Sequence, residues 1–254
     1  MRLFLMFFLC LTACSSKVVS IHQYKTASLA QSTQLQRTAQ FTNLVGQGII
    51  TYRRTVKNKE QKDQCDFNFW KQGDSISLQV EKLDTLVAWF GGEGKNTWLF
   101  EMSKDETVLT IGGKHNMFDD IQVALTLLGL TPLPTGTLKL DGELVTLLDE
   151  EGRTWTATYH PYSYRPHEIV LSDGEHTLRA EHEDEIGVEI DNLSALGWPT
   201  TGSAVTIFDS RKNESIKIRF EYLSTIVEDE PFDYVMSLES LIKEYKPTKI
   251  VRGG

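Results

Sequence analysis

The sequence predicts a mainly β protein of the α+β class, organised around an antiparallel meander that curls on itself. Apolar and polar residues alternate through a series of short segments between residues 44 and 223, which is the pattern of half-buried strands. Polar or glycine-containing turns separate these segments, so successive strands are expected to pair with each other. Three helical segments accompany the strands, at residues 27–40, 117–128 and 238–245.

The first 16 residues, MRLFLMFFLCLTACSS, predict export. The apolar run from Leu3 to Leu11 is too short to span a bilayer as a helix, but it has the length of a signal-peptide core. Leu11-Thr12-Ala13-Cys14 resembles the lipobox of bacterial lipoproteins, which implies cleavage before Cys14 and covalent attachment of diacylglycerol and an N-acyl chain to it. A second acyl chain makes such an anchor stable, because one acyl chain alone binds a membrane only marginally. The alternative is an ordinary signal peptide cut near Ala13, with Cys14 incidental.

These features divide the chain into three parts. We expect a signal peptide at residues 1–13, a lipidated tether at 14–25 and a single β domain at 26–254. The chain has 26 basic and 35 acidic residues, a formal charge of −9, which argues against nucleic acid and against a broad electrostatic hold on anionic lipid. Cys65 is the one cysteine left after the leader and Cys14, so no internal disulfide is expected.

The middle helix is the clearest of the three. Asp119 and Asp120 fall in its predicted first turn, where negative charge is favourable against the helix dipole. Gly129 ends the helix, and Pro132 and Pro134 prevent it from resuming. Its apolar stripe consists of Ile121, Leu125 and Leu128.

Aromatic residues are dense in the first half of the meander, and they are candidates for the wall of a lipid-binding cavity. Binding an acyl chain requires a concave apolar surface that its own side chains leave partly empty. The helical stripe would supply a lid over this surface. The alternative is that the same residues fill a closed core, as alternating aromatic residues commonly do. The aromatic candidates are Phe67, Phe69, Trp70, Trp89, Phe90, Trp98 and Phe100.

The order of elements resembles the LolA/LolB family of lipoprotein carriers and receptors. Four stretches carry the resemblance: Leu44-Val45-Gly46-Gln47-Gly48, Trp98-Leu99-Phe100, the apolar segment 118–134, and Pro231-Phe232-Asp233. The resemblance implies a strongly curved antiparallel sheet forming an incomplete β-barrel lidded by helices, with a late strand at Pro231-Phe232-Asp233. Its apolar interior would hold the acyl chains of lipoproteins.

The same resemblance implies partners and location. The membrane-anchored branch of the family is itself a lipoprotein, so Cys14 indicates the LolB side, with a periplasmic carrier protein as a possible partner. Ser15 stands where an aspartate retains lipoproteins in the inner membrane of enteric bacteria, which favours the periplasmic face of the outer membrane. We expect a monomer that binds lipid or lipoprotein acyl chains and holds the membrane through Cys14. The alternative is a structural or protein-binding lipoprotein with a fully packed β core.

Signatures of metal binding and catalysis are weak. His176 and His182 share strand parity, but six residues of strand separate them by about 20 Å, so a solvated acidic loop around His182 is expected rather than a metal site. The sequence contains no Gly-x-Ser-x-Gly motif and no phosphate-binding loop. Cys65 is expected to be a small core residue. We therefore predict a protein that is not an enzyme and has no metal or cofactor besides its covalent lipid.

Overall fold

The computed structural model describes residues 27–57, 59–112, 120–141, 144–159, 165–183, 202–225 and 231–253. The predicted signal peptide, Cys14 and the whole predicted tether lie outside the described residues. Residues 117–119 of the predicted middle helix also lie outside them.

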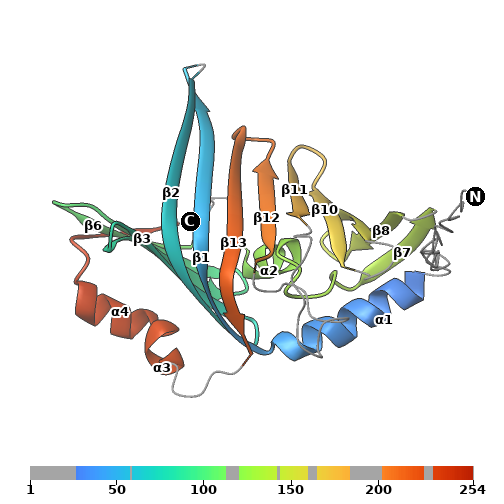
Figure 1. The fold of residues 1–254 in the computed structure, drawn as a ribbon, viewed down its shortest axis with the longest axis horizontal. Coiled ribbons are helices and arrows are strands. Elements are labelled where there is room, and N and C mark those ends of the chain that lie inside the picture. Colours follow the sequence, from blue (N-terminus) through green and yellow to red (C-terminus); the bar gives the residue numbers. More distant parts are fainter. Residues whose placement is uncertain are drawn as a thin grey trace, which may run out of the picture.

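The described residues form one 14-stranded sheet, and its strand order follows the chain closely (Figure 1). The order across the sheet is β14-β6-β5-β4-β3-β2-β1-β13-β12-β11-β10-β9-β8-β7. The strands are β1 (Asn43–Val56), β2 (Lys59–Gln72), β3 (Ser75–Lys82), β4 (Thr85–Glu93), β5 (Asn96–Met102), β6 (Thr107–Ile111), β7 (Gly136–Asp141), β8 (Leu144–Asp149), β9 (Thr154–Tyr159), β10 (Pro166–Ser172), β11 (Thr177–Glu183), β12 (Ala204–Asp209), β13 (Glu214–Ser224) and β14 (Lys249–Arg252).

Neighbouring strands pair antiparallel, with the single exception of β14 in the described sheet, which runs parallel to β6. The two edge strands, β14 and β7, do not pair with each other, so the sheet stays open. A sheet of this many twisted strands must curl. The predicted fold class, an incomplete and strongly curved barrel, is confirmed.

The helices lie against both faces of the sheet. They are α1 (Ala27–Thr38) with a 3-10 turn (Ala39–Phe41), α2 (Ile121–Leu127), α3 (Phe232–Val235) and α4 (Leu238–Tyr245). None of the described helices is long and apolar enough to cross a membrane. We call the face that packs on α2 the inner face, and the face of β2–β6 that packs on α3 and α4 the outer face.

Two local expectations need correction, and one strand was not expected. The middle helix begins at Ile121, because Asp120 is its N-cap and accepts a hydrogen bond from the backbone N–H of Gln122 at 2.9 Å. The segment predicted as a late strand at Pro231-Phe232-Asp233 instead forms the start of α3. The sequence pattern did not predict β14, which follows α4 and is too short to show an alternating pattern.

Candidate functional site

Strand alternation places adjacent aromatic residues on opposite faces of the sheet. Phe67 and Phe69 of β2 belong to the inner cluster, whereas Trp70 packs against the outer cluster. Successive side chains of a strand point to opposite faces, so this separation follows from the local geometry. The same rule divides Trp89 from Phe90 in β4.

The structure therefore does not bring all of the predicted cavity residues together. Six lie in the inner cluster: Phe67, Phe69, Phe90, Ile121, Leu125 and Leu128. Four lie in or against the outer cluster: Trp70, Trp89, Trp98 and Phe100. The period-two alternation of the sequence already contains this division, because Trp70 follows Phe69 directly and Phe90 follows Trp89.

The outer cluster is a closed core beneath α3 and α4. The indole Nε1 of Trp89 donates a hydrogen bond to Ser77 Oγ at 2.7 Å, and Ser77 Oγ donates to the carbonyl of Val235 in α3 at 2.8 Å. Gly91 leaves space for the ring of Trp98, since a Cβ at Gly91 would lie 2.4 Å from Trp98 Cζ2. This chain of contacts ties α3 to β3 and β4.

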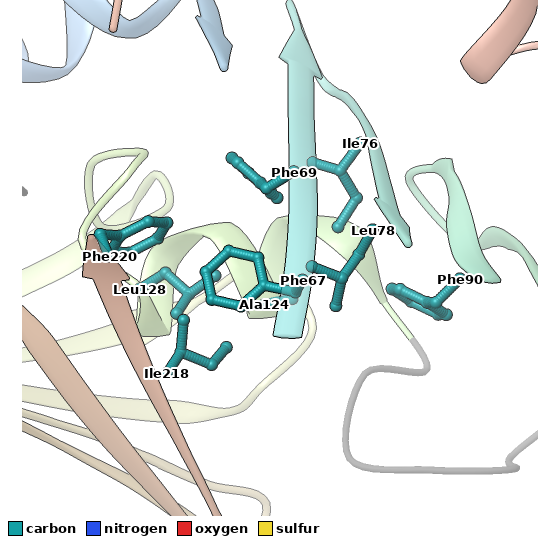
Figure 2. A pocket seen from close by; sticks show the side chains of 9 residues that line it. All are labelled: Phe67, Phe69, Ile76, Leu78, Phe90, Ala124, Leu128, Ile218 and Phe220. Carbon is teal, nitrogen blue, oxygen red and sulfur yellow. The ribbon is translucent and has the colours of Figure 1, made fainter. Parts of the chain in front are cut away.

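The inner face carries an apolar pocket between the two halves of the sheet and α2 (Figure 2). It is lined by Phe67, Phe69, Ile76, Leu78, Phe90, Ala124, Leu128, Ile218 and Phe220. Its free volume is only about 20 Å³, enough for roughly one water molecule. At this pocket the inner face is apolar and nearly filled by its own side chains, which is nearer to the closed-core alternative than to a vacant hollow.

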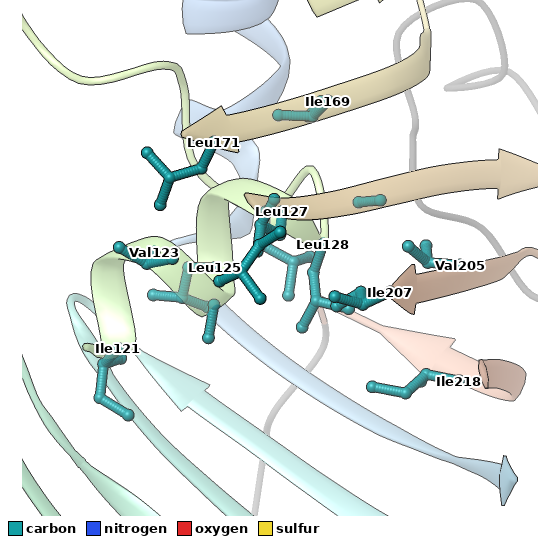
Figure 3. Close-up of a cluster of buried hydrophobic side chains, with 14 of the residues drawn as sticks. Ile121, Val123, Leu125, Leu127, Leu128, Ile169, Leu171, Val205, Ile207 and Ile218 are labelled. Atoms are coloured by element: carbon teal, nitrogen blue, oxygen red, sulfur yellow. The ribbon is translucent and has the colours of Figure 1, made fainter. Parts of the chain in front are cut away.

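Helix α2 and the residues after it fill the inner face (Figure 3). Ile121, Leu125, Leu127 and Leu130 are each 0 % exposed, and only Gln122 is part-exposed between residues 121 and 130. A helix that is apolar on all sides is stable only when it is enclosed. We call residues 121–130 the plug segment, because they occupy the space that the sheet surrounds.

Few polar contacts join the plug segment to the sheet. The N–H of Ile121 donates to the carbonyl of Gly94 at 2.9 Å, and the carbonyl of Leu127 faces the imidazole of His182. Asp120, just before the segment, lies 3.9 Å from Arg153. The remaining contacts are apolar packing, which another apolar group can replace without breaking hydrogen bonds.

An ionic group lies at the start of the plug segment and joins two distant turns of the sheet. Lys95, after β4, pairs with Glu151, after β8, at 2.7 Å, and Glu151 also lies 3.3 Å from Arg153. Asp149 accepts hydrogen bonds from Arg153 Nε at 2.8 Å and from Trp155 Nε1 at 2.9 Å. Burial raises the pKa of Asp149, but these hydrogen bonds outweigh burial and hold the pKa below its usual value.

A second cavity, not predicted from the sequence, lies beyond the other end of the plug segment. It has a volume of about 300 Å³ and is lined by Gln34, Leu35, Pro132, Leu133, Pro134, Thr135, Gly136 and Tyr159. This volume is at the lower end of the range for small-molecule sites. The prolines were recognised in the sequence as helix breakers, but the approach of α1 that completes the wall depends on tertiary packing.

Leu83 is another residue that the sequence reasoning missed. It lies in the two-residue turn between β3 and β4, and 88 % of its surface is exposed. Its φ of +52° is in the left-handed region, which costs a leucine about 1 kcal/mol. A strained and fully exposed leucine gains nothing from packing within the chain. Its position between two alternating strands was the available signal.

The titratable candidates are placed as follows. His182 is 4 % exposed in β11, so the expectation of a solvated loop at this residue is wrong. His176 lies in the turn between β10 and β11, and its Nε2 is 2.9 Å from Oδ1 of Asp209, the last residue of β12. Cys65 is part-buried, and burial raises the pKa of its thiol. Within the described ranges, no group of three His, Cys, Asp or Glu side chains is placed to hold a metal ion.

The arrangement defines an open antiparallel half-barrel whose inner face is closed by a short apolar helix. The sequence matches no protein-family model and no curated protein. A solved structure of a DUF1329 family protein from Desulfovibrio piger shares the fold, with a TM-score of 0.50, 9% identity, and coverage of 84% of this chain and 98% of that chain.

Two further solved structures are similar. A LolA superfamily protein from Nitrosomonas europaea aligns with a TM-score of 0.49, 9% identity, and coverage of 82% of this chain and 98% of that chain. A domain named as an outer membrane lipoprotein-sorting protein, from Vibrio parahaemolyticus, aligns with a TM-score of 0.48, 10% identity, and coverage of 82% and 97%.

Proposed function

We propose that this protein is a non-enzymatic lipoprotein, anchored through Cys14 at the periplasmic face of the outer membrane, that binds acyl chains of lipoproteins or other lipids. The acyl chain would occupy the inner face after displacing the plug segment. Lipidation of Cys14 would hold the domain beside its source of lipid. A periplasmic carrier protein would deliver or receive the cargo.

The observation that carries this proposal is the nature of the plug. The sheet surrounds an apolar space, and a short segment with few polar attachments occupies it. Each methylene of an acyl chain that becomes buried contributes about 0.8 kcal/mol. This free energy can offset the apolar burial that the plug segment loses when it leaves the inner face. Exchange of one apolar occupant for another keeps the net free energy small, which suits a site that must also release its ligand.

The two cavities give this exchange enough room. Ala124 and Leu128 of the plug segment line the first cavity, and Pro132 to Gly136, which follow the plug segment, line the second. Displacing the plug segment would remove Ala124 and Leu128 from the wall of the first cavity and so enlarge it. The second cavity alone provides about 300 Å³, which would admit the end of a chain before the plug segment moves.

A titration with a fluorescent fatty acid tests the proposal. The chain beginning at Ser15 should bind saturably, and affinity should rise with acyl length until the cavity is full. Leu78→Gln places an amide on the part-buried wall and should weaken binding by about tenfold. The matched control is Leu148→Gln at a 50 % exposed leucine of β8, which should bind as the wild type does.

A second candidate function is a structural or protein-binding lipoprotein with a filled core. The free volume of about 20 Å³ at the inner face favours it. It predicts no saturable fatty-acid binding, no lipid in a solvent extract of the purified protein, and a protein partner recovered by cross-linking. Mass spectrometry of the extract separates the two candidates directly.

A further inference from the structure

The hairpin of β1 and β2 projects beyond the rest of the sheet (Figure 1). Each strand has 14 residues, more than any other strand described. On one side, pairing with β13 ends at Arg54 and Glu214, and on the other side pairing with β3 ends at Asp66 and Glu81. Residues 53–57 and 59–64 are exposed on both faces of the ribbon, so no part of the described chain covers them.

The projecting part is basic, in contrast to the chain as a whole. We call residues 53–64 the basic ribbon. It carries five basic and two acidic side chains, whereas the whole chain has a formal charge of −9. The basic residues are Arg53, Arg54, Lys57, Lys59 and Lys62, and the acidic residues are Glu60 and Asp63.

Both acidic groups of the ribbon already have cationic partners. Glu60 lies 3.9 Å from Arg53, and Asp63 lies 3.1 Å from Lys82 of β3. In the part of the chain that the structure describes, Lys57, Lys59 and Lys62 take part in no ion pair. No carboxylate of the described residues pairs with these three ammonium groups, and Lys57 and Lys59 lie next to the tip of the hairpin.

We propose that the basic ribbon docks on the head groups of anionic phospholipids. Residues 55–57 extend past the last pairing with β13 by about 10 Å at roughly 3.3 Å per residue. The Debye length at physiological salt is about 8 Å, so the ribbon's charges act on a lipid surface while those of the acidic body are largely screened. The net negative charge of the chain argues against binding of anionic lipid over a broad surface. It does not argue against local binding by the basic ribbon.

The composition of the ribbon favours lipid over an acidic protein. Lysine is depleted at protein–protein interfaces, where buried aromatic residues and arginine supply most of the affinity. Clusters of lysine and arginine next to a membrane are instead typical of binding to anionic lipid. Val56, 37 % exposed beside Lys57, adds an apolar group that a bilayer interface accepts. No residue of the inner cavity takes part, so the inference stands apart from acyl binding.

Sedimentation with vesicles tests the docking. Every described element lies within residues 27–253, so the chain beginning at Ser15 retains the fold without a lipid anchor. It should bind vesicles of phosphatidylcholine mixed with phosphatidylglycerol, bind less as salt increases, and not bind phosphatidylcholine alone. Each lysine near the surface contributes about a fivefold increase in affinity, so the triple variant Lys57→Gln/Lys59→Gln/Lys62→Gln should bind roughly 100-fold more weakly.

The matched control is the triple variant Lys104→Gln/Lys139→Gln/Lys243→Gln, which removes the same charge from exposed sites elsewhere. It should bind as the wild type does. The inference is overturned by equal binding to neutral and anionic vesicles, by no binding at low salt, or by an equal loss in both triple variants. Fatty-acid titration of the ribbon variant should be unchanged, which separates a failure here from a failure of acyl binding.

Discussion

His182 lies in the core of β11, against the plug segment, and burial lowers the pKa of its imidazole to about 3. In the unfolded chain the same group binds a proton at an ordinary pKa of 6.5. The unfolded state therefore gains a proton first as the pH falls. The stability that neutral, buried His182 contributes to the folded state is therefore complete above about pH 6.5. It is lost progressively as the pH falls toward 3.

This linkage predicts a specific pH dependence. Between about pH 6 and pH 4, the free energy of unfolding should fall by about 1.4 kcal/mol per pH unit from this residue alone. Urea denaturation across that range should show the slope in the wild type. His182→Leu should lack it. An identical slope in His182→Leu and the wild type would show that another group is responsible.

At Leu83 we expect a substitution to stabilise the fold. Asparagine tolerates the left-handed region better than leucine does, so Leu83→Asn should raise the free energy of unfolding by about 1 kcal/mol. Thermal denaturation measures the change. The control is Leu148→Asn, which replaces an exposed leucine inside a regular strand and should not stabilise. A loss of stability in Leu83→Asn would mean that the leucine makes contacts of its own.

At the scale of elements, the ionic group beside α2 connects the β4–β5 turn with the β8–β9 turn. The carboxylate of Asp149 is its buried member, with 2 % of its side chain exposed. Its pKa is held below the usual value, so its contribution is present at neutral pH and is lost only as the pH falls through that lowered pKa.

Neutralising this carboxylate should loosen the turn beside the plug segment. Asp149→Asn removes the charge that Arg153 and Trp155 satisfy, and should lower the free energy of unfolding at neutral pH by about 2 kcal/mol. Urea denaturation checks this value. Asp84→Asn, at an exposed turn position, is the control and should change stability by less than about 0.5 kcal/mol. Equal effects of the two substitutions would show that the Asp149 carboxylate does not stabilise the fold as described.

At the scale of the whole molecule, the sequence predicted what local pattern can encode. The curled antiparallel sheet and the helix Leu238–Tyr245 are found where the pattern indicated. Local pattern could not predict the parallel pairing of β14 with β6. That contact follows helices and joins residues far apart in the chain. Local pattern also could not predict how much of the inner face is filled, because the free volume depends on how the plug segment and the strands pack together.

Hydrogen–deuterium exchange of the plug segment tests the central claim most directly. Without ligand, the amides of residues 121–130 should exchange slowly, because the segment is buried in the core. With a saturating fatty acid they should exchange faster, while the strands of the inner face keep their protection. Saturable binding with unchanged or increased protection of residues 121–130 would contradict displacement of the plug, and with it the proposed mode of acyl binding.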